Sequence, residues 1–77
     1  MKMDGKGYEY DDEGKLIFEG EYFENERNGN GKQYDIDGKL LFEGQYLNGV
    51  RWNGKVKIYD NNGDLIFEKE YVNGVEK

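Results

Sequence analysis

A chain of 77 residues with a formal net charge of −6 is long enough for one small domain and too short for a second independent core. It contains no Cys, His, Ser, Thr, Ala or Pro, which excludes disulfides, hydroxyl and thiol nucleophiles, and the usual zinc, copper and haem ligands. Apolar runs are short, as at Leu16–Phe18, so no transmembrane helix or signal-peptide core is expected. Small secreted domains usually carry disulfides, so a chain without cysteine is expected to be cytoplasmic. With these ligand types absent and no long apolar segment, we also expect a soluble protein with no metal and no cofactor.

Strands and tight turns alternate along the whole sequence. Aromatic and branched residues alternate with polar ones, and 12 glycines leave no stretch with a helical stripe. The predicted strands, in chain order, span residues 6–11, 15–24, 30–35, 39–47, 55–60 and 64–73. The pattern therefore predicts an all-β fold of three consecutive β-hairpins in one antiparallel meander.

An Asp-x-x-Gly segment closes each predicted hairpin, at Asp11–Gly14, Asp35–Gly38 and Asp60–Gly63. The Asp opens a type I turn, and the glycine supplies the left-handed residue of a G1 bulge. The first turn places Asp11 opposite Lys15, an opposite-charge pair that the third turn lacks. The segments Asp35–Gly38 and Asp60–Asp64 also resemble calcium loops, but no bidentate Glu follows at the required spacing, so turn chemistry is the preferred interpretation.

Three copies of one unit account for the domain 1–77, with units at residues 5–28, 29–52 and 53–77. The period is 24 residues and then 25. With the turns fixed as above, each unit contributes to one predicted aromatic face, with Gly20 and Gly44 as slots for rings and Lys69 replacing the third slot. The members of this face are Tyr8, Tyr10, Leu16, Phe18 and Tyr22 in the first unit, Tyr34, Leu40, Phe42 and Tyr46 in the second, and Tyr59, Leu65, Phe67 and Tyr71 in the third. The opposite face carries carboxylates such as Glu19 and Glu21, which we interpret as a solvated surface rather than a catalytic pair.

From Gly29 the sequence reads G-x-G-x-x-Y-D-x-x-G-x-L-x-F-E-G-x-Y-x-N-G-x-R, which resembles the MORN (membrane occupation and recognition nexus) repeat. The resemblance covers nearly the whole chain, with departures at Val56, at Lys69 and at Glu24–Asn25. It implies a single-layer, twisted antiparallel sheet that serves as a scaffold for binding or dimerisation and is not an enzyme. Some bacterial proteins of this type look like antitoxin or immunity partners.

These observations predict an interaction module that binds a protein or peptide partner, or a second copy, through the aromatic face. The predicted anchors are Tyr10, Phe18, Tyr22, Tyr34, Phe42, Tyr46 and Tyr59, together with Trp52. Trp52 falls at the irregularity in repeat length, and two interpretations stay open for it: a binding anchor, or a ring packed over the connection between hairpins.

The negative net charge of the chain determines which alternative partners are expected. The competing interpretation is a toxin-neutralising protein that uses the acidic side chains of the first unit, Glu19, Glu21, Glu24 and Glu26. Seventeen acids against eleven bases oppose binding to nucleic acid and to anionic membranes, so a phospholipid-associated role is a lesser alternative. The open strands at 6–11 and 64–73 also predict a weak homodimer.

Overall fold

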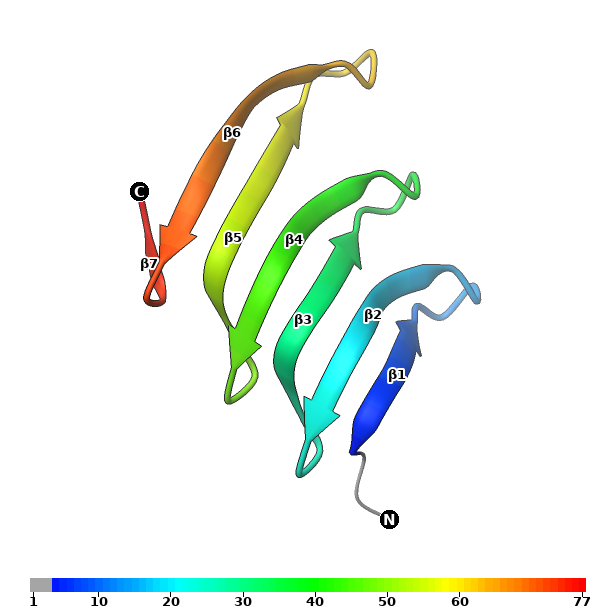
Figure 1. Cartoon of the computed structure of the whole chain (residues 1–77). Coiled ribbons are helices and arrows are strands. Elements are labelled where there is room, and N and C mark those ends of the chain that lie inside the picture. Colours follow the sequence, from blue (N-terminus) through cyan, green and yellow to red (C-terminus); the bar gives the residue numbers. More distant parts are fainter. Residues whose placement is uncertain (1–3) are drawn as a thin grey trace.

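One open antiparallel sheet makes up the fold of residues 4–77, which are the residues described by a computed structural model of the chain (Figure 1). The strands follow one another in sequence order, and the molecule measures 41 × 32 × 14 Å, as expected for a single layer. Their bounds are β1 Gly5–Tyr10, β2 Leu16–Phe23, β3 Glu26–Tyr34, β4 Leu40–Leu47, β5 Val50–Tyr59, β6 Leu65–Val72 and β7 Val75–Glu76. The all-β meander is confirmed, and residues 1–3 of the predicted domain lie outside the described residues. No helix in the described part of the chain is long and apolar enough to cross a membrane.

The connections between repeats are shorter than predicted. β3 and β5 begin at Glu26 and Val50, whereas the sequence pattern placed their starts at residues 30 and 55. The strands begin early because tight turns at Glu24–Asn25 and Asn48–Gly49 join the repeats, with positive φ at both central residues. The same turn recurs at Asn73–Gly74 and leads into β7. The predicted open edge at 64–73 is therefore wrong at its end, where β7 pairs with Tyr71 and Val72.

The Asp-x-x-Gly turns form as predicted. In each, the amide of the glycine donates to the carbonyl of the Asp, and the glycine has φ between +82° and +85°. The Asp11 carboxylate accepts hydrogen bonds from the amides of Glu13 and Lys15, both at 2.9 Å. Asp35 and Asp60 do the same in the other two turns. The third hairpin is thus stabilised like the others, because the Asp acts on the turn backbone and not through a lysine.

A β-bulge corrects the predicted aromatic face. Tyr10 pairs with Leu16, as predicted, but Glu9 then pairs with Phe18, so that Ile17 is an extra residue. One extra residue reverses which side chains share a face, and the shift recurs in the other two hairpins. The tyrosines before the turns therefore lie on the face opposite the Phe18 ring; they are Tyr8, Tyr10, Tyr34 and Tyr59. The predicted grouping of these tyrosines with the phenylalanines is wrong.

The core consists of rings laid along the sheet. Phe18 and Phe42 are 0 % exposed, Tyr22 is 7 % and Tyr46 is 3 % exposed. They form a T-shaped series, with the Phe18 and Tyr46 centroids 5.2 Å apart at 89°. We call the side of the sheet that carries them the ring face.

Paired glycines make this burial possible in a single layer. Gly7, Gly20, Gly31, Gly44 and Gly54 lie side by side across five strands. A Cβ atom added to Gly31 would lie 2.8 Å from the Phe18 ring and 2.9 Å from the Tyr46 ring. At Gly20, a predicted slot, an added Cβ atom would lie 2.8 Å from the Phe18 ring, whereas at Gly44 it would first meet the backbone of β5, at the Asn53 carbonyl oxygen.

Candidate interaction surface

Two arginines cover the ring face. The Arg27 guanidinium lies 4.2 Å from the Phe18 ring centroid and donates to both carboxylate oxygens of Glu9, each at 2.8 Å. The Tyr22 hydroxyl donates to the same carboxylate at 2.5 Å. The hydrogen bond from Arg27 holds the pKa of Glu9 below its usual value, and burial, followed by the bond to Glu9, raises the pKa of Tyr22 to about 12.

The second repeat reproduces this arrangement without the acid. Gln33 Oε1 accepts hydrogen bonds from the Tyr46 hydroxyl at 2.9 Å and from Arg51 at 3.0 and 3.2 Å. Arg51 lies 4.9 Å from the Phe42 ring centroid. The Glu9–Arg27 and Gln33–Arg51 pairs were not predicted from the sequence, although Gln33 and Arg51 follow Glu9 and Arg27 by 24 residues, and this spacing is the signal that identifies them.

The eight predicted anchors do not form one surface. Phe18, Tyr22, Phe42 and Tyr46 are core residues, so their rings pack against the protein itself. The other three tyrosines lie on the opposite face. Tyr10 is exposed, Tyr34 donates to Glu19 Oε1 at 2.6 Å, and Tyr59 donates to the carbonyl of Leu40 at 2.6 Å.

Trp52 packs over the last turn of the sheet. Its carbonyl accepts a hydrogen bond from the Gly74 amide at 2.8 Å, and a Cβ atom on Gly74 would lie 2.8 Å from the indole ring. The side chain is half-buried in this position. Of the two interpretations of Trp52, the geometry favours the ring packed over a connection between hairpins.

Lysines and glutamates alternate across the face opposite the rings. We call this the charged face, and it has opposite charges at every cross-strand pair of charged residues in the register. These pairs are Lys6–Glu21, Glu19–Lys32, Lys32–Glu43, Glu43–Lys55, Lys55–Glu70 and Lys57–Glu68. Lys32 Nζ lies 3.7 Å from Glu43 Oε2, and Lys57 forms an ion pair with Glu68. A slip by one residue would break every pair, so the pattern fixes the register.

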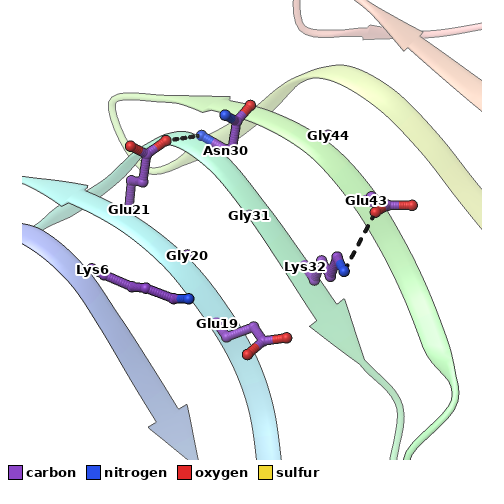
Figure 2. Close-up of a pocket in the computed structure, with 9 residues that line it drawn as sticks. All are labelled: Lys6, Glu19, Gly20, Glu21, Asn30, Gly31, Lys32, Glu43 and Gly44. Carbon is purple, nitrogen blue, oxygen red and sulfur yellow. Dashed lines mark hydrogen bonds and ion pairs between the residues drawn. The ribbon is translucent and has the colours of Figure 1, made fainter.

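A shallow groove of about 520 Å³ lies on the charged face over β1, β2, β3 and β4 (Figure 2). Its floor runs over the glycine row, and Lys6 and Lys32 extend along it. The full lining consists of Lys6, Glu19, Gly20, Glu21, Asn30, Gly31, Lys32, Glu43 and Gly44. Glu21 is held in place because it accepts a hydrogen bond from the Asn30 amide at 2.7 Å. The groove thus offers both signs of charge next to each other.

Metal ligation has no support in the described residues. Nowhere in residues 4–77 do three or more His, Cys, Asp or Glu side chains gather closely enough to hold a metal ion. The turn carboxylates that resembled calcium ligands, such as Asp35 and Asp60, accept hydrogen bonds from their own turn amides.

The sheet of repeated hairpins agrees with the comparison to protein families. A family described as a MORN repeat variant matches residues 3–25, 27–48 and 52–73, and the chain belongs to this family. The matched segments start within two residues of the units read from the sequence. Searches of curated proteins and of solved structures found no match. MORN repeats are typically non-catalytic and generally mediate interactions with proteins or lipids.

Proposed function

We propose that this chain is a non-enzymatic scaffold module that binds an extended segment of a partner protein along the groove of the charged face. The observation that carries the proposal is the groove itself, where Lys6 and Lys32 lie among Glu19, Glu21 and Glu43. Exposed Tyr8 and half-buried Tyr34 flank it on β1 and β3. Tyrosine beside paired charges is typical of protein-binding surfaces.

The charges of the groove favour a protein segment over a phosphate-rich ligand. Three carboxylates and two ammonium groups line it, and the whole chain carries a net charge of −6. A membrane surface of anionic lipid, or a nucleic acid, carries a net negative charge, which the carboxylates repel. A peptide that alternates basic and acidic side chains can pair with both signs at once.

The experiment is a selection of unstructured peptides displayed on phage, followed by calorimetry with the enriched sequences. We expect them to contain both basic and acidic residues and to bind at least about tenfold more weakly to Glu43→Lys and to Lys32→Glu, because each change creates like charges in the groove. Glu13→Lys is the matched control, since Glu13 is exposed in the first turn, outside the groove lining.

Enriched peptides that bind Glu43→Lys and Lys32→Glu as tightly as the unchanged chain would contradict the groove proposal. Flotation with phosphatidylserine vesicles tests the lipid alternative. We expect no recovery of the protein with the vesicles, and substantial recovery would favour a lipid partner instead.

A further inference from the structure

β6 exposes apolar side chains that are half-buried or buried at the equivalent positions of β2 and β4. Leu65, Ile66 and Phe67 are 50 %, 56 % and 49 % exposed. The residues equivalent to Phe67 are Phe18 in β2 and Phe42 in β4, and both are 0 % exposed. The difference arises because β3 and β5 lie along β2 and β4, whereas β7 pairs only with Tyr71 and Val72 of β6 and the Lys77 amide donates to the Glu70 carbonyl at 2.7 Å. No strand among residues 4–77 pairs with the outer edge of Leu65–Lys69, so this edge lies open beside an exposed apolar run, which is a typical site of strand addition.

β1 has the features of the strand that would cover this edge. Its residues Gly5–Tyr10 are equivalent, one repeat earlier, to Gly29–Tyr34 of β3, the strand that covers β2. Among residues 4–77, only β2 pairs with β1, so the outer side of β1 is open as well (Figure 1). One chain therefore presents both an uncovered edge and a copy of the strand that covers the equivalent edges.

We infer that copies of this chain associate head to tail, with β1 of one copy pairing antiparallel with β6 of the next. The β2–β3 pairing, with Phe18 opposite Gln33 and Gly20 opposite Gly31, supplies the register. Carried to the new contact, it places Phe67 opposite Glu9 of the second copy, Glu68 opposite Tyr8 and Lys69 opposite Gly7. This association uses the sheet edges, and Lys6 is the one residue of the groove lining that it brings into the contact.

Charge and space at the contact agree with this register. Glu70 comes beside Lys6 of the second copy on the charged face, and Lys69 comes beside Glu9 on the ring face. Gly7 leaves room for the Lys69 side chain, which stands where β2 and β4 have glycine. β7 corresponds to the start of β3, so it occupies a part of β6 that β1 does not need.

The contact joins two different edges, so each added copy presents a fresh β6 edge. Association of this heterologous kind yields linear oligomers and not a closed pair. The charged face continues across the contact, which extends the alternation of acids and bases from one copy to the next.

Sedimentation velocity over a range of protein concentrations tests the association. We expect the weight-average mass to rise with concentration, and Phe67→Glu to raise the dissociation constant at least about tenfold, because it removes an apolar side chain and places a carboxylate opposite Glu9 of the next copy. Leu47→Glu is the matched control, since Leu47 is exposed on the interior strand β4 and pairs with Val50, and it should leave association unchanged. A chain that stays monomeric at about 1 mM, or a Phe67→Glu variant that associates like the unchanged chain, would overturn the inference.

Cysteine cross-linking tests the register directly, because the chain has no native cysteine. Directly opposed residues of antiparallel strands lie within disulfide reach. Mixing Tyr8→Cys with Glu68→Cys under mild oxidation should give a cross-linked heterodimer as the main product, while Tyr8→Cys mixed with Asp60→Cys should not. Homodimers of the single variants as the main products would indicate an isologous contact and reject the head-to-tail arrangement.

Discussion

Gly31 lies where the Phe18 and Tyr46 rings meet the backbone of β3. Both rings are within 3 Å of the position that a Cβ atom would occupy. In Gly31→Ala the two buried rings must move, and we expect a loss of about 1–3 kcal/mol in the free energy of unfolding. Urea denaturation gives this value, with Lys32→Ala on the opposite side of the same strand as the control. An alanine variant as stable as the control would show that the rings can rearrange freely.

Glu9 and Gln33 occupy equivalent positions in the first and second repeats. Replacing Glu9 by Gln therefore distinguishes the contribution of its charge to stability from the contribution of its hydrogen bonds. Because Arg27 holds the pKa of Glu9 below 4.5, the stability from this carboxylate is present above pH 4.5 and is lost as the pH falls through the folded pKa. Glu9→Gln should keep the hydrogen bonds, as Gln33 does, and cost about 1 kcal/mol at pH 7. Its stability should fall less steeply than that of the unchanged chain between pH 5 and 3, measured by urea denaturation. A parallel fall in both proteins would assign the acid sensitivity to other carboxylates.

Ionisation of Tyr22 should lower the stability of the fold at alkaline pH. Its pKa is raised from 10 to about 12, so the neutral hydroxyl stabilises the fold below pH 10, and this contribution is lost as the pH rises toward 12. Tyr22→Phe removes the titrating group and should flatten the fall of stability above pH 10. Thermal denaturation from pH 8 to 11 checks this. Tyr8→Phe, which alters an exposed tyrosine, should retain the steep fall.

At the scale of single elements, the three Asp-x-x-Gly turns set the register of the hairpins. Asp35→Ala removes the acceptor of two backbone amides, those of Asp37 and Lys39. We expect a loss of about 1–2 kcal/mol, comparable to that of a helix cap. Asp37→Ala in the same turn keeps its amide and should cost less than about 0.5 kcal/mol. Equal losses in the two variants would show that the Asp35 carboxylate does not support the turn.

The sequence predicts these turns because their chemistry is local. Asp11, Asp35 and Asp60 bond to amides two and four residues later, and the left-handed glycine follows at a fixed offset. The bulge at Ile17 could not be predicted in this way. It depends on Phe18 reaching across to the glycines of the next strand, which is a contact between hairpins and leaves no local turn signal.

The same reasoning explains which parts of the candidate surface were predictable. Aromatic positions follow from the repeat, but the side of the sheet on which each ring lies depends on one bulge, so the predicted anchors were divided between two faces. The charged face was interpreted as a solvated surface, and its alternating order became visible only when the register paired residues such as Lys32 and Glu43. Arg27 required both the repeat and the fold, since it contacts Glu9 of a strand two positions away.

At the scale of the molecule, every described strand pairs through its backbone only with its neighbours in sequence order. The buried rings belong to the first two repeats, and Phe67 of the third is half exposed. In repeat architectures of this kind, stability is approximately a sum of local units and their interfaces. The interior strands β2, β3 and β4 should therefore be more stable than the strands at either end.

Native-state hydrogen exchange at low protein concentration measures this gradient. We expect the amides of β3 and β4 to exchange at least about tenfold more slowly than those of β6 and β7, because they lie beside the fully buried rings. Uniform protection along the sheet would indicate that all repeats unfold together. Raising the protein concentration should slow exchange at β1 and β6 by covering their edges, and Phe67→Glu should abolish that slowing while leaving the protection of β3 and β4 unchanged. Slowing that persists in Phe67→Glu would place the contact between copies elsewhere on the sheet.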